Sequence, residues 1–235
     1  MIHAYTWPTS NGKKLHIMLA ECDLAYTIQP IDIGAGDQHQ PDFLDICPNG
    51  KIPAIVDDDG PDGVPISIFE SGAILIYLAN KNGSLLPSAS EDPRGHYNVL
   101  QWLMFQVGGV GPMLGQNHHF DHYAPEKIPY AIDRYVNETA RLYGVIDRRL
   151  RDSAYLAGDN YTIADIATFP WMINHKVQRQ NLNDFPNLKR WYNTIANRPA
   201  VQEGLMILSN KQRREPLTSE QHANYFGQSP TRHTK

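Results

Sequence analysis

The sequence is poor in cysteine, since its 235 residues include only Cys22 and Cys47. Two cysteines are too few for a disulfide framework and are typical of a protein kept in a reducing compartment. The chain also has no excess of positive charge, because 21 lysines and arginines stand against 25 aspartates and glutamates, which gives a net charge of −4. Nucleic acids and anionic membrane surfaces, which attract basic proteins, are therefore not expected partners.

Long apolar stretches are missing as well. The longest, residues 73–79, is far short of the ~20 residues that span a bilayer. Residues 1–5 lack the basic start and the apolar run of a secretion signal. These absences predict a cytoplasmic protein. The length is enough for one large domain or two small ones with a sizeable core.

Residues 1–83 alternate between strand and helix signals. The helices are expected to begin at the turn 8–12, at Pro41 and at residues 70–71. Short strands are predicted at residues 2–6, 26–33, 51–56 and 64–69. The resulting order, βαβαββα, is that of a thioredoxin-like α/β domain.

Beyond a linker at residues 84–92, the strand signal disappears. Apolar residues recur at helical spacing within 100–107 and 132–150, and short helices are expected at 186–195 and 199–208. Thr162 and Asp165 have the spacing of a helix capping box. We therefore predict an all-α C-terminal domain over residues 93–208. Residues 209–235 are polar and aperiodic, which predicts an extended or disordered tail.

The start of the first helix lacks the Cys-x-x-Cys pair that a thioredoxin-like fold normally carries there. Thr9-Ser10-Asn11-Gly12 occupies this position, so a thiol would have to be borrowed, and glutathione is the abundant thiol of the cell. Thr9 and Asn11 can donate hydrogen bonds to a sulfur, and a helix N-terminus favours the thiolate. The same residues also serve as ordinary helix caps. Tyr5 and Ser10 are rival hydroxyl donors, although Tyr5 is expected in the core.

A second motif could bind the groups of glutathione other than its thiol. Glu70 can pair with the ammonium group of a γ-glutamyl unit, while the Ser71 hydroxyl and N–H bind its α-carboxylate. Pro53 lacks an N–H, which leaves the backbone of Ile52 free to pair with a peptide edge. Lys51 can reach the glycyl carboxylate at the other end of glutathione.

Five segments resemble the nu class of the glutathione transferase superfamily: 7–12, 43–44, 49–56, 69–75 and 107–120. The most diagnostic is Gly-Gly-x-Gly-Pro-Met-x-Gly-Gln at 108–116. The resemblance covers residues 1 to about 208 and implies the glutathione transferase fold, a homodimer, and two glutathione molecules or glutathione disulfide in each site. It also implies a disulfide-bond reductase that works without a protein cysteine, by thiol–disulfide exchange.

The resemblance also implies roles for individual residues. Thr9 and Asn11 would contact the sulfur, and Arg134 would reach the site from the second domain. The first glutathione would be held by Gln38, Ile52, Glu70 and Ser71, with a cis Ile52–Pro53 bond. The sequence departs from the family at Ser10, where a proline is common, and at Cys47, which leaves some direct thiol participation open.

Other functions remain open at this stage. The same site suits a transferase acting on small electrophiles or a peroxidase acting on organic hydroperoxides, and the scaffold also suits a non-catalytic binding or regulatory protein. His118 and His122 have the i, i+4 spacing of metal ligands, but no cysteine or second-shell pattern supports a metal. The glycines at 108–115 follow a helix rather than a strand, which argues against a nucleotide loop.

Overall fold

The computed structural model describes residues 1–22, 24–212 and 215–227. Its N-terminal part contains a four-stranded sheet in the order β2-β1-β3-β4, with β1 and β2 parallel and the other pairs antiparallel. The strands are β1 (Ile2–Thr6), β2 (Tyr26–Pro30), β3 (Ala54–Asp57) and β4 (Ile66–Phe69). With α1 (Ser10–Glu21), α2 (Pro41–Ile46) and α3 (Ser71–Asn82), they confirm the predicted βαβαββα order.

Three strands are shorter than predicted, and prolines mark their ends. β2 ends at Pro30 instead of continuing to residue 33. β3 begins after Pro53 and β4 begins after Pro65. Because proline has no N–H to donate to a ladder, it restricts strand pairing at these points. The Ile52–Pro53 bond is cis, as the resemblance implies.

The two faces of the sheet are covered differently. One large apolar cluster joins β1 and β3 to α1, α3 and the C-terminal helices. A smaller cluster under α2 contains Phe43, Cys47 and Ala54, with Tyr5 packed against it. Tyr5 therefore belongs to the core on the α2 side, as expected from the sequence.

The C-terminal part is all-helical in the residues that the structure describes, as predicted. It contains α4 (Pro93–Phe105), α5 (Gly111–His118), α6 (Pro129–Arg151), α7 (Ile163–Met172), α8 (Pro186–Ala196) and α9 (Pro199–Met206). Two π-helical turns, η3 (Gln106–Val110) and η4 (His119–Tyr123), flank α5. The predicted capping box of Thr162 and Asp165 begins α7. None of the described helices is long and apolar enough to cross a membrane.

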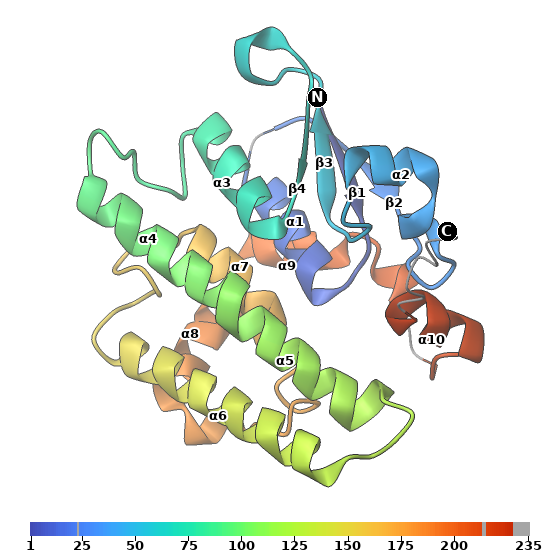
Figure 1. Cartoon of the computed structure of the whole chain (residues 1–235). Coiled ribbons are helices and arrows are strands. Elements are labelled where there is room, and N and C mark those ends of the chain that lie inside the picture. Colours follow the sequence, from blue (N-terminus) through green and yellow to red (C-terminus); the bar gives the residue numbers. More distant parts are fainter. Residues whose placement is uncertain (23, 213–214, 228–235) are drawn as a thin grey trace, which may run out of the picture.

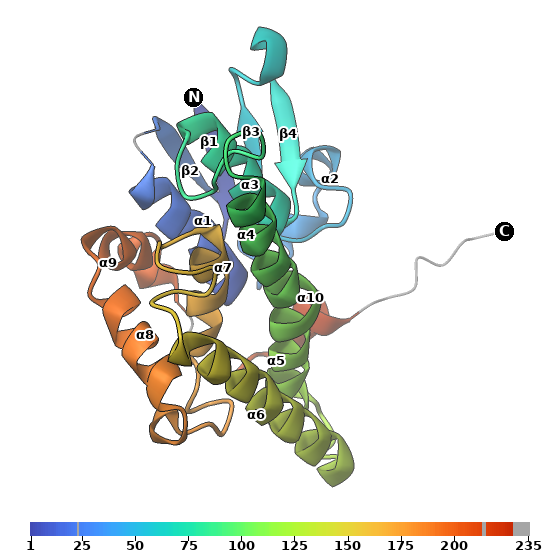
Figure 2. The ribbon, with the colours of Figure 1, turned by 90° about the vertical axis from the view of Figure 1, so that its left-hand side faces the viewer.

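Helix α1 lies between the sheet and the helical part. In Figures 1 and 2 the strands occupy the upper half of the molecule, α5, α6 and α8 the lower half, and α1 and α7 the middle. α9 returns to pack closely on α1, because Gly204 lacks a side chain: a Cβ there would lie 2.7 Å from Ile17 Cα. Helix α1 is therefore held in place by the sheet on one side and by the C-terminal helices on the other.

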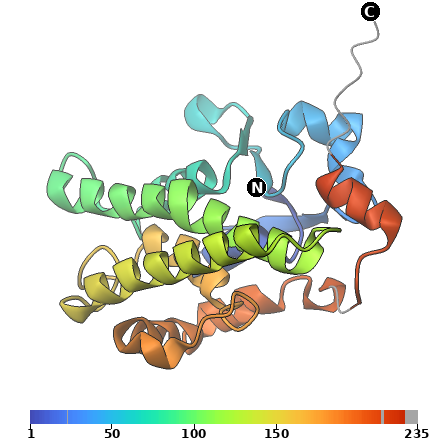
Figure 3. The same cartoon turned by 60° about the horizontal axis from the view of Figure 1, so that its bottom comes forward.

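The expectation of an extended or disordered tail is wrong for residues 219–226, which form α10 (Ser219–Phe226). Thr218 and Gln221 form a complete capping box at its start, a local signal that the polar composition obscured. A short 3₁₀ turn, Ser209–Lys211, precedes it. The rest of that prediction falls partly on residues 213–214 and 228–235, which lie outside the described residues. Figure 3 shows α10, in red, beside the blue segment that contains α2.

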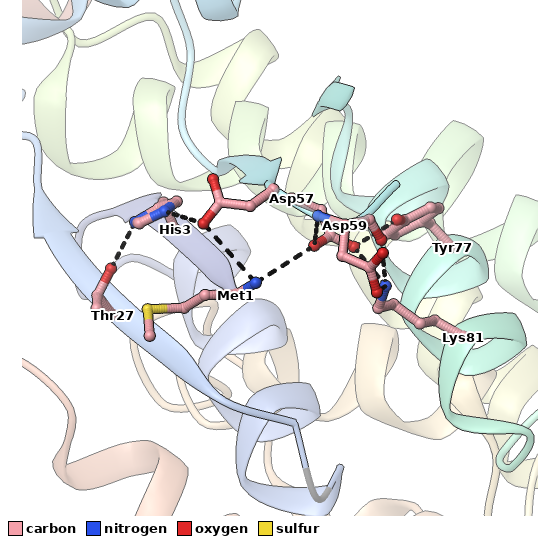
Figure 4. Close-up of polar contacts among 8 residues, drawn as sticks. Met1, His3, Thr27, Asp57, Asp59, Tyr77 and Lys81 are labelled. Atoms are coloured by element: carbon pink, nitrogen blue, oxygen red, sulfur yellow. Dashed lines mark hydrogen bonds and ion pairs between the residues drawn. The ribbon is translucent and has the colours of Figure 1, made fainter. Parts of the chain in front are cut away.

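A buried carboxylate, Asp57, anchors the far end of the sheet (Figure 4). It accepts hydrogen bonds from Tyr77 Oη at 2.5 Å and from the N–H of Asp59 at 3.0 Å, and its Oδ2 lies 3.0 Å from Lys81 Nζ. Burial alone would raise the pKa of Asp57, but these donors outweigh it and hold the pKa below its ordinary value. Asp57 thus ties α3 to the end of β3.

We expect Asp57→Asn to destabilise the fold by about 1–3 kcal/mol, because an amide cannot accept all of these hydrogen bonds. The stability that ionised Asp57 contributes is complete above its unfolded pKa of about 4 and is lost as the pH falls through the lower native pKa. Urea unfolding between pH 7 and pH 3 should therefore show a smaller acid-induced loss in the variant than in the wild type. Parallel pH profiles would contradict the assignment.

Candidate functional site

Three cavities contain most of the predicted site residues. The first, of about 270 Å³, is lined by residues 7–11 on one side and by His118, Trp171 and Asn174 on the other, with Tyr225 from the tail. The second, of about 70 Å³, lies between α1 and the start of α3 and shares Asn11 with the first. The third, of about 670 Å³, lies between the loop that contains Lys51 and the tail.

Thr9 and Asn11 line the first cavity from the first turn of α1. Thr9 is the N-cap, and its Oγ1 accepts a hydrogen bond from the N–H of Gly12 at 3.2 Å. A hydroxyl that accepts one bond still has its own proton to donate, so capping and binding are compatible. Asn11 Oδ1 accepts from Trp171 Nε1 at 3.2 Å. Because an indole only donates, this contact fixes the amide orientation and leaves the Nδ2 hydrogens as the donating side.

The two rival donors, Ser10 and Tyr5, make other contacts. Ser10 Oγ accepts a hydrogen bond from Asn174 Nδ2 at 3.3 Å, which joins the first turn of α1 to the helical part. The ring of Tyr5 faces Phe43, with ring centroids 6.3 Å apart, and Tyr5 lines none of the three cavities. Tyr5 therefore presents no hydroxyl to these cavities, whereas Ser10 lines the first cavity beside Thr9 and keeps its own proton to donate.

The second cavity brings together five of the residues singled out in the sequence: Asn11, Lys51, Ile52, Glu70 and Ser71. Glu70 is the N-cap of α3 and has φ 70° and ψ 116°, a left-handed conformation that costs a non-glycine residue about 1–3 kcal/mol. Asn49 Nδ2 lies 3.5 Å from Glu70 Oε1. The Glu70 carboxylate can therefore pair with an ammonium group, while the Ser71 hydroxyl and the helix N-terminus beside it can bind a carboxylate.

Gln38 is buried at the edge of the third cavity. Its Nε2 donates to Ile33 O at 3.3 Å and to Asn224 O at 3.0 Å, so the tail is bonded directly to a predicted binding residue. Its Oε1 is buried without a hydrogen-bond partner in the described part of the chain. Such an acceptor is suited to an N–H of a bound peptide.

Arg134 is the one predicted site residue that the structure does not bring to the cavities. It lies on α6 with 54% of its side chain exposed, and its Nη1 is 3.7 Å from Glu138 Oε2, one helical turn away. It lines none of the three cavities. The i, i+4 ion pair holds the guanidinium on the outer surface of the helix.

His118 is a site residue that the sequence suggested only as a metal ligand. Its ring stacks on Trp171, with centroids 6.2 Å apart, and it lines the first cavity. Burial, with a smaller effect of His122, lowers the pKa of His118 to about 4, so the imidazole is neutral near pH 7. No group of three His, Cys, Asp or Glu side chains within residues 1–22, 24–212 and 215–227 could hold a metal.

The sequence also gave no indication of Trp171 and Asn174, because neither belongs to a local motif. They reach the site only through the packing of α7 and its following turn against α1. The hydrogen bond between Asn11 and Trp171 joins residues far apart in the sequence, so only the tertiary structure reveals it.

Both cysteines are free and buried. Cys47 lines the second cavity, where its Sγ donates to Lys51 O at 3.3 Å. Burial, followed by the charge of Glu21, raises the pKa of Cys22 to about 11. A buried thiol with a raised pKa is a poor nucleophile at neutral pH, so Cys22 is not a candidate for thiol chemistry.

Helix α10, in the tail, borders the first and third cavities. Phe226 packs against His119 and Tyr123, with ring centroids 4.9 Å and 5.3 Å apart. His222 Nε2 lies 2.9 Å from Tyr123 O, and Asn224 Nδ2 donates to Gly34 O at 2.7 Å. The tail thus contacts both halves of the molecule and forms a wall of the first and third cavities.

Comparison with known families agrees with this geometry. Residues 1–80 match the model of the glutathione S-transferase N-terminal domain, and residues 123–199 match that of the C-terminal domain. A relative in Escherichia coli (strain K12), the disulfide-bond oxidoreductase YfcG, is 52% identical over 207 residues, covering 88% of this chain and 95% of its own. The chain belongs to the glutathione S-transferase family.

Solved structures of family members resemble this fold closely. A glutathione transferase from Burkholderia graminis, which has two glutathione molecules bound per subunit, superposes with a TM-score of 0.82 at 45% identity, over 87% of each chain. One from Pseudomonas putida, with one glutathione disulfide per subunit, gives 0.81 at 45% identity, over 88% of this chain and 91% of its own. The thioredoxin-like half and the helical half are therefore those of the glutathione transferase fold.

We expect Phe226→Ala to loosen α10, because it removes the ring contacts with His119 and Tyr123, which are worth about 0.5–1.5 kcal/mol each. Hydrogen–deuterium exchange should be faster at the backbone N–H groups of His222 and Gly227, which are bonded within the helix. The control is Glu220→Ala, an exposed position on the same helix. Equal exchange in both variants would show that the aromatic contacts do not hold the tail.

Proposed function

We propose that this protein is a glutathione-dependent disulfide-bond reductase that uses the thiolate of bound glutathione in place of a protein cysteine. The observation that carries the proposal is the start of α1, where Thr9 and Asn11 present hydrogen-bond donors and no cysteine is present. The second cavity adds a seat for a γ-glutamyl group at Glu70 and Ser71. The name of YfcG and the glutathione bound to the two structural relatives support the same chemistry.

The residues present suit glutathione as the substrate. Glu70 pairs with the γ-glutamyl ammonium, and the Ser71 hydroxyl and N–H bind the α-carboxylate. The backbone of Ile52 pairs with the cysteinyl unit, and Lys51 attracts the glycyl carboxylate. The unpartnered Oε1 of Gln38 is available as an acceptor beside this path.

The chemistry balances as a two-electron exchange. Thr9 Oγ1–H and Asn11 Nδ2–H stabilise the thiolate, which attacks one sulfur of a substrate disulfide and expels the other as a thiolate that takes up a proton. A second glutathione thiolate then attacks the glutathione sulfur of the mixed disulfide and releases the second substrate thiol. Two glutathiones are oxidised to one glutathione disulfide, and one substrate disulfide is reduced to two thiols.

Asn11→Ala should slow the reduction of a small model disulfide by about tenfold or more, because a hydrogen bond to a charged group is worth about 1.5–3 kcal/mol. The pKa of bound glutathione, followed by thiolate absorbance, should rise in the same variant, since a thiolate donor is lost. The matched control is Ser10→Ala, which removes the neighbouring hydroxyl of the same cavity together with its contact with Asn174 and should keep most of the rate. A full rate in Asn11→Ala together with a large loss in Ser10→Ala would reassign the sulfur donor.

Replacing both Cys22 and Cys47 with alanine should preserve more than half of the glutathione-dependent rate, because neither thiol is needed for the exchange. The measurement is kcat with the same disulfide, compared at equal folded fraction by circular dichroism. Loss of turnover in the folded double variant would point to a protein thiol, and the single variants would identify which one.

Transfer of glutathione to electrophiles and reduction of organic hydroperoxides are the alternatives that share this thiolate. A chloro-nitroaromatic acceptor and cumene hydroperoxide, assayed beside the disulfide, separate the three activities. We expect the disulfide to be the best substrate, because the relative YfcG, 52% identical, is named a disulfide-bond oxidoreductase. A non-catalytic protein would show none of the three.

We further propose a nu-class homodimer located in the cytoplasm. The diagnostic segment 108–116 supports the class, and the two free, buried thiols suit a reducing compartment. Exposed apolar side chains of α4, Tyr97 and Met104, support a subunit contact along that helix. Sedimentation of a monomer at micromolar concentration would contradict the dimer.

A further inference from the structure

Lys14 is a buried lysine beneath the second cavity, with only 2% of its surface exposed. It projects from α1, and its Nζ donates to Ser71 Oγ at 3.1 Å and to Gln106 Oε1 at 2.7 Å. It therefore connects three elements: α1, the start of α3 and the π-helical turn η3. Lysines are almost never fully buried unless they are paired, so this placement needs a reason.

The ammonium group has no carboxylate within ion-pair distance in the described part of the chain. Its partners Ser71 and Gln106 are neutral. Burial lowers the pKa of Lys14 to about 7, and the charge of Glu70, which raises it, offsets this only in part. On its own helix, His16 is neutral at pH 7, because burial and the charge of Lys13 lower its pKa to about 4. The surroundings of Lys14 therefore leave an ammonium group without a neutralising partner, and a negatively charged group bound nearby would supply one.

The surrounding structure holds Lys14 firmly in this position. Gln106 is fully buried, and its Nε2 has no hydrogen-bond partner among the described residues. Gly111 leaves room for that amide, since a Cβ at this position would lie 2.9 Å from Gln106 Nε2. Gln106 thus directs its oxygen to the lysine and cannot neutralise it.

Ser71 connects the lysine to the cavity. Its Oγ accepts a hydrogen bond from Lys14, so its single proton is available to donate to a group in the cavity. Ser71 is also the first residue of α3, where backbone N–H groups favour an anion. A carboxylate bound at Ser71 would thus lie one hydroxyl away from the buried ammonium.

We propose that Lys14 is a positioning residue which, through Ser71, supplies the positive charge for the α-carboxylate of the γ-glutamyl group, and that binding is accompanied by proton uptake on Lys14. This inference rests on the proposed function, since it assigns a ligand carboxylate to Ser71. The free protein holds Lys14 mostly neutral above pH 7, and the carboxylate favours the charged form. Proton uptake should therefore be largest near pH 8 and small near pH 6.

The test is calorimetric titration with S-methylglutathione, which has no ionisable thiol to add a proton signal of its own. At pH 8 the observed enthalpy, plotted against the ionisation enthalpy of Tris, HEPES and phosphate buffers, should indicate uptake of about half a proton or more. In Lys14→Met the slope should fall to near zero and Kd should rise about tenfold, equivalent to about 1.4 kcal/mol. KM for glutathione should rise similarly, with kcat at saturation changed less than threefold.

A second variant separates charge from packing. Gln106→Glu places a permanent carboxylate next to Lys14, so the lysine is charged before the ligand arrives; proton uptake should disappear although the ligand still binds. Lys81→Met is the matched control, because Lys81 belongs to α3 itself, at the end opposite Ser71, and pairs with Asp57 instead of a residue of the site. It should change stability and leave the proton uptake intact.

The outcomes are distinguishable. Normal binding of S-methylglutathione without proton uptake in the wild type, or equal uptake in the wild type and folded Lys14→Met, would overturn the role of Lys14 alone. Absence of any heat of binding in the wild type at millimolar ligand would overturn the proposed function itself. Unfolding of Lys14→Met would leave Gln106→Glu as the deciding variant, and unchanged uptake there would overturn the inference.

Discussion

The burial of α1 between the sheet and the helical half is the constraint on which the site depends. Gly204 lets α9 approach the backbone of Ile17, and α7 also packs on α1. These contacts hold the first turn of α1 in place, so that the amide of Asn11 meets the indole of Trp171. Donors for a thiolate are effective only when they are oriented before the ligand binds, and the two halves of the fold provide that orientation together.

The charges around the site compensate for the missing cysteine. In the proposed site, a helix N-terminus, the hydroxyl of Thr9 and the amide of Asn11 would surround the sulfur of glutathione, and Glu70 and Ser71 would bind its γ-glutamyl end. Lys14 lies buried behind Ser71 and donates a hydrogen bond to its hydroxyl. The protein itself contributes polar groups of fixed orientation, and the reactive sulfur arrives with the substrate.

The tail gives the site a feature outside the two family-domain matches, which end at residue 199. α10 bonds to Gln38 through the backbone of Asn224 and packs Phe226 on His119, so it contacts the N-terminal and C-terminal halves at once. Such a wall restricts the size of what enters the first and third cavities.

The sequence by itself determined the element order, the cap at Thr9, the helix start at Glu70 and Ser71, and the lack of a cysteine at the start of α1. These features are encoded by local spacing and residue type. The tertiary structure alone decided the contacts of Trp171, Asn174 and Lys14 with the site, the position of Arg134 outside it, and the packing of the tail helix against both halves of the molecule. The physical reason is that these features depend on how distant helices pack. The capping box of Thr218 and Gln221 is a local signal for the tail helix, but the surfaces on which Phe226 packs, at His119 and Tyr123, exist only in the folded chain.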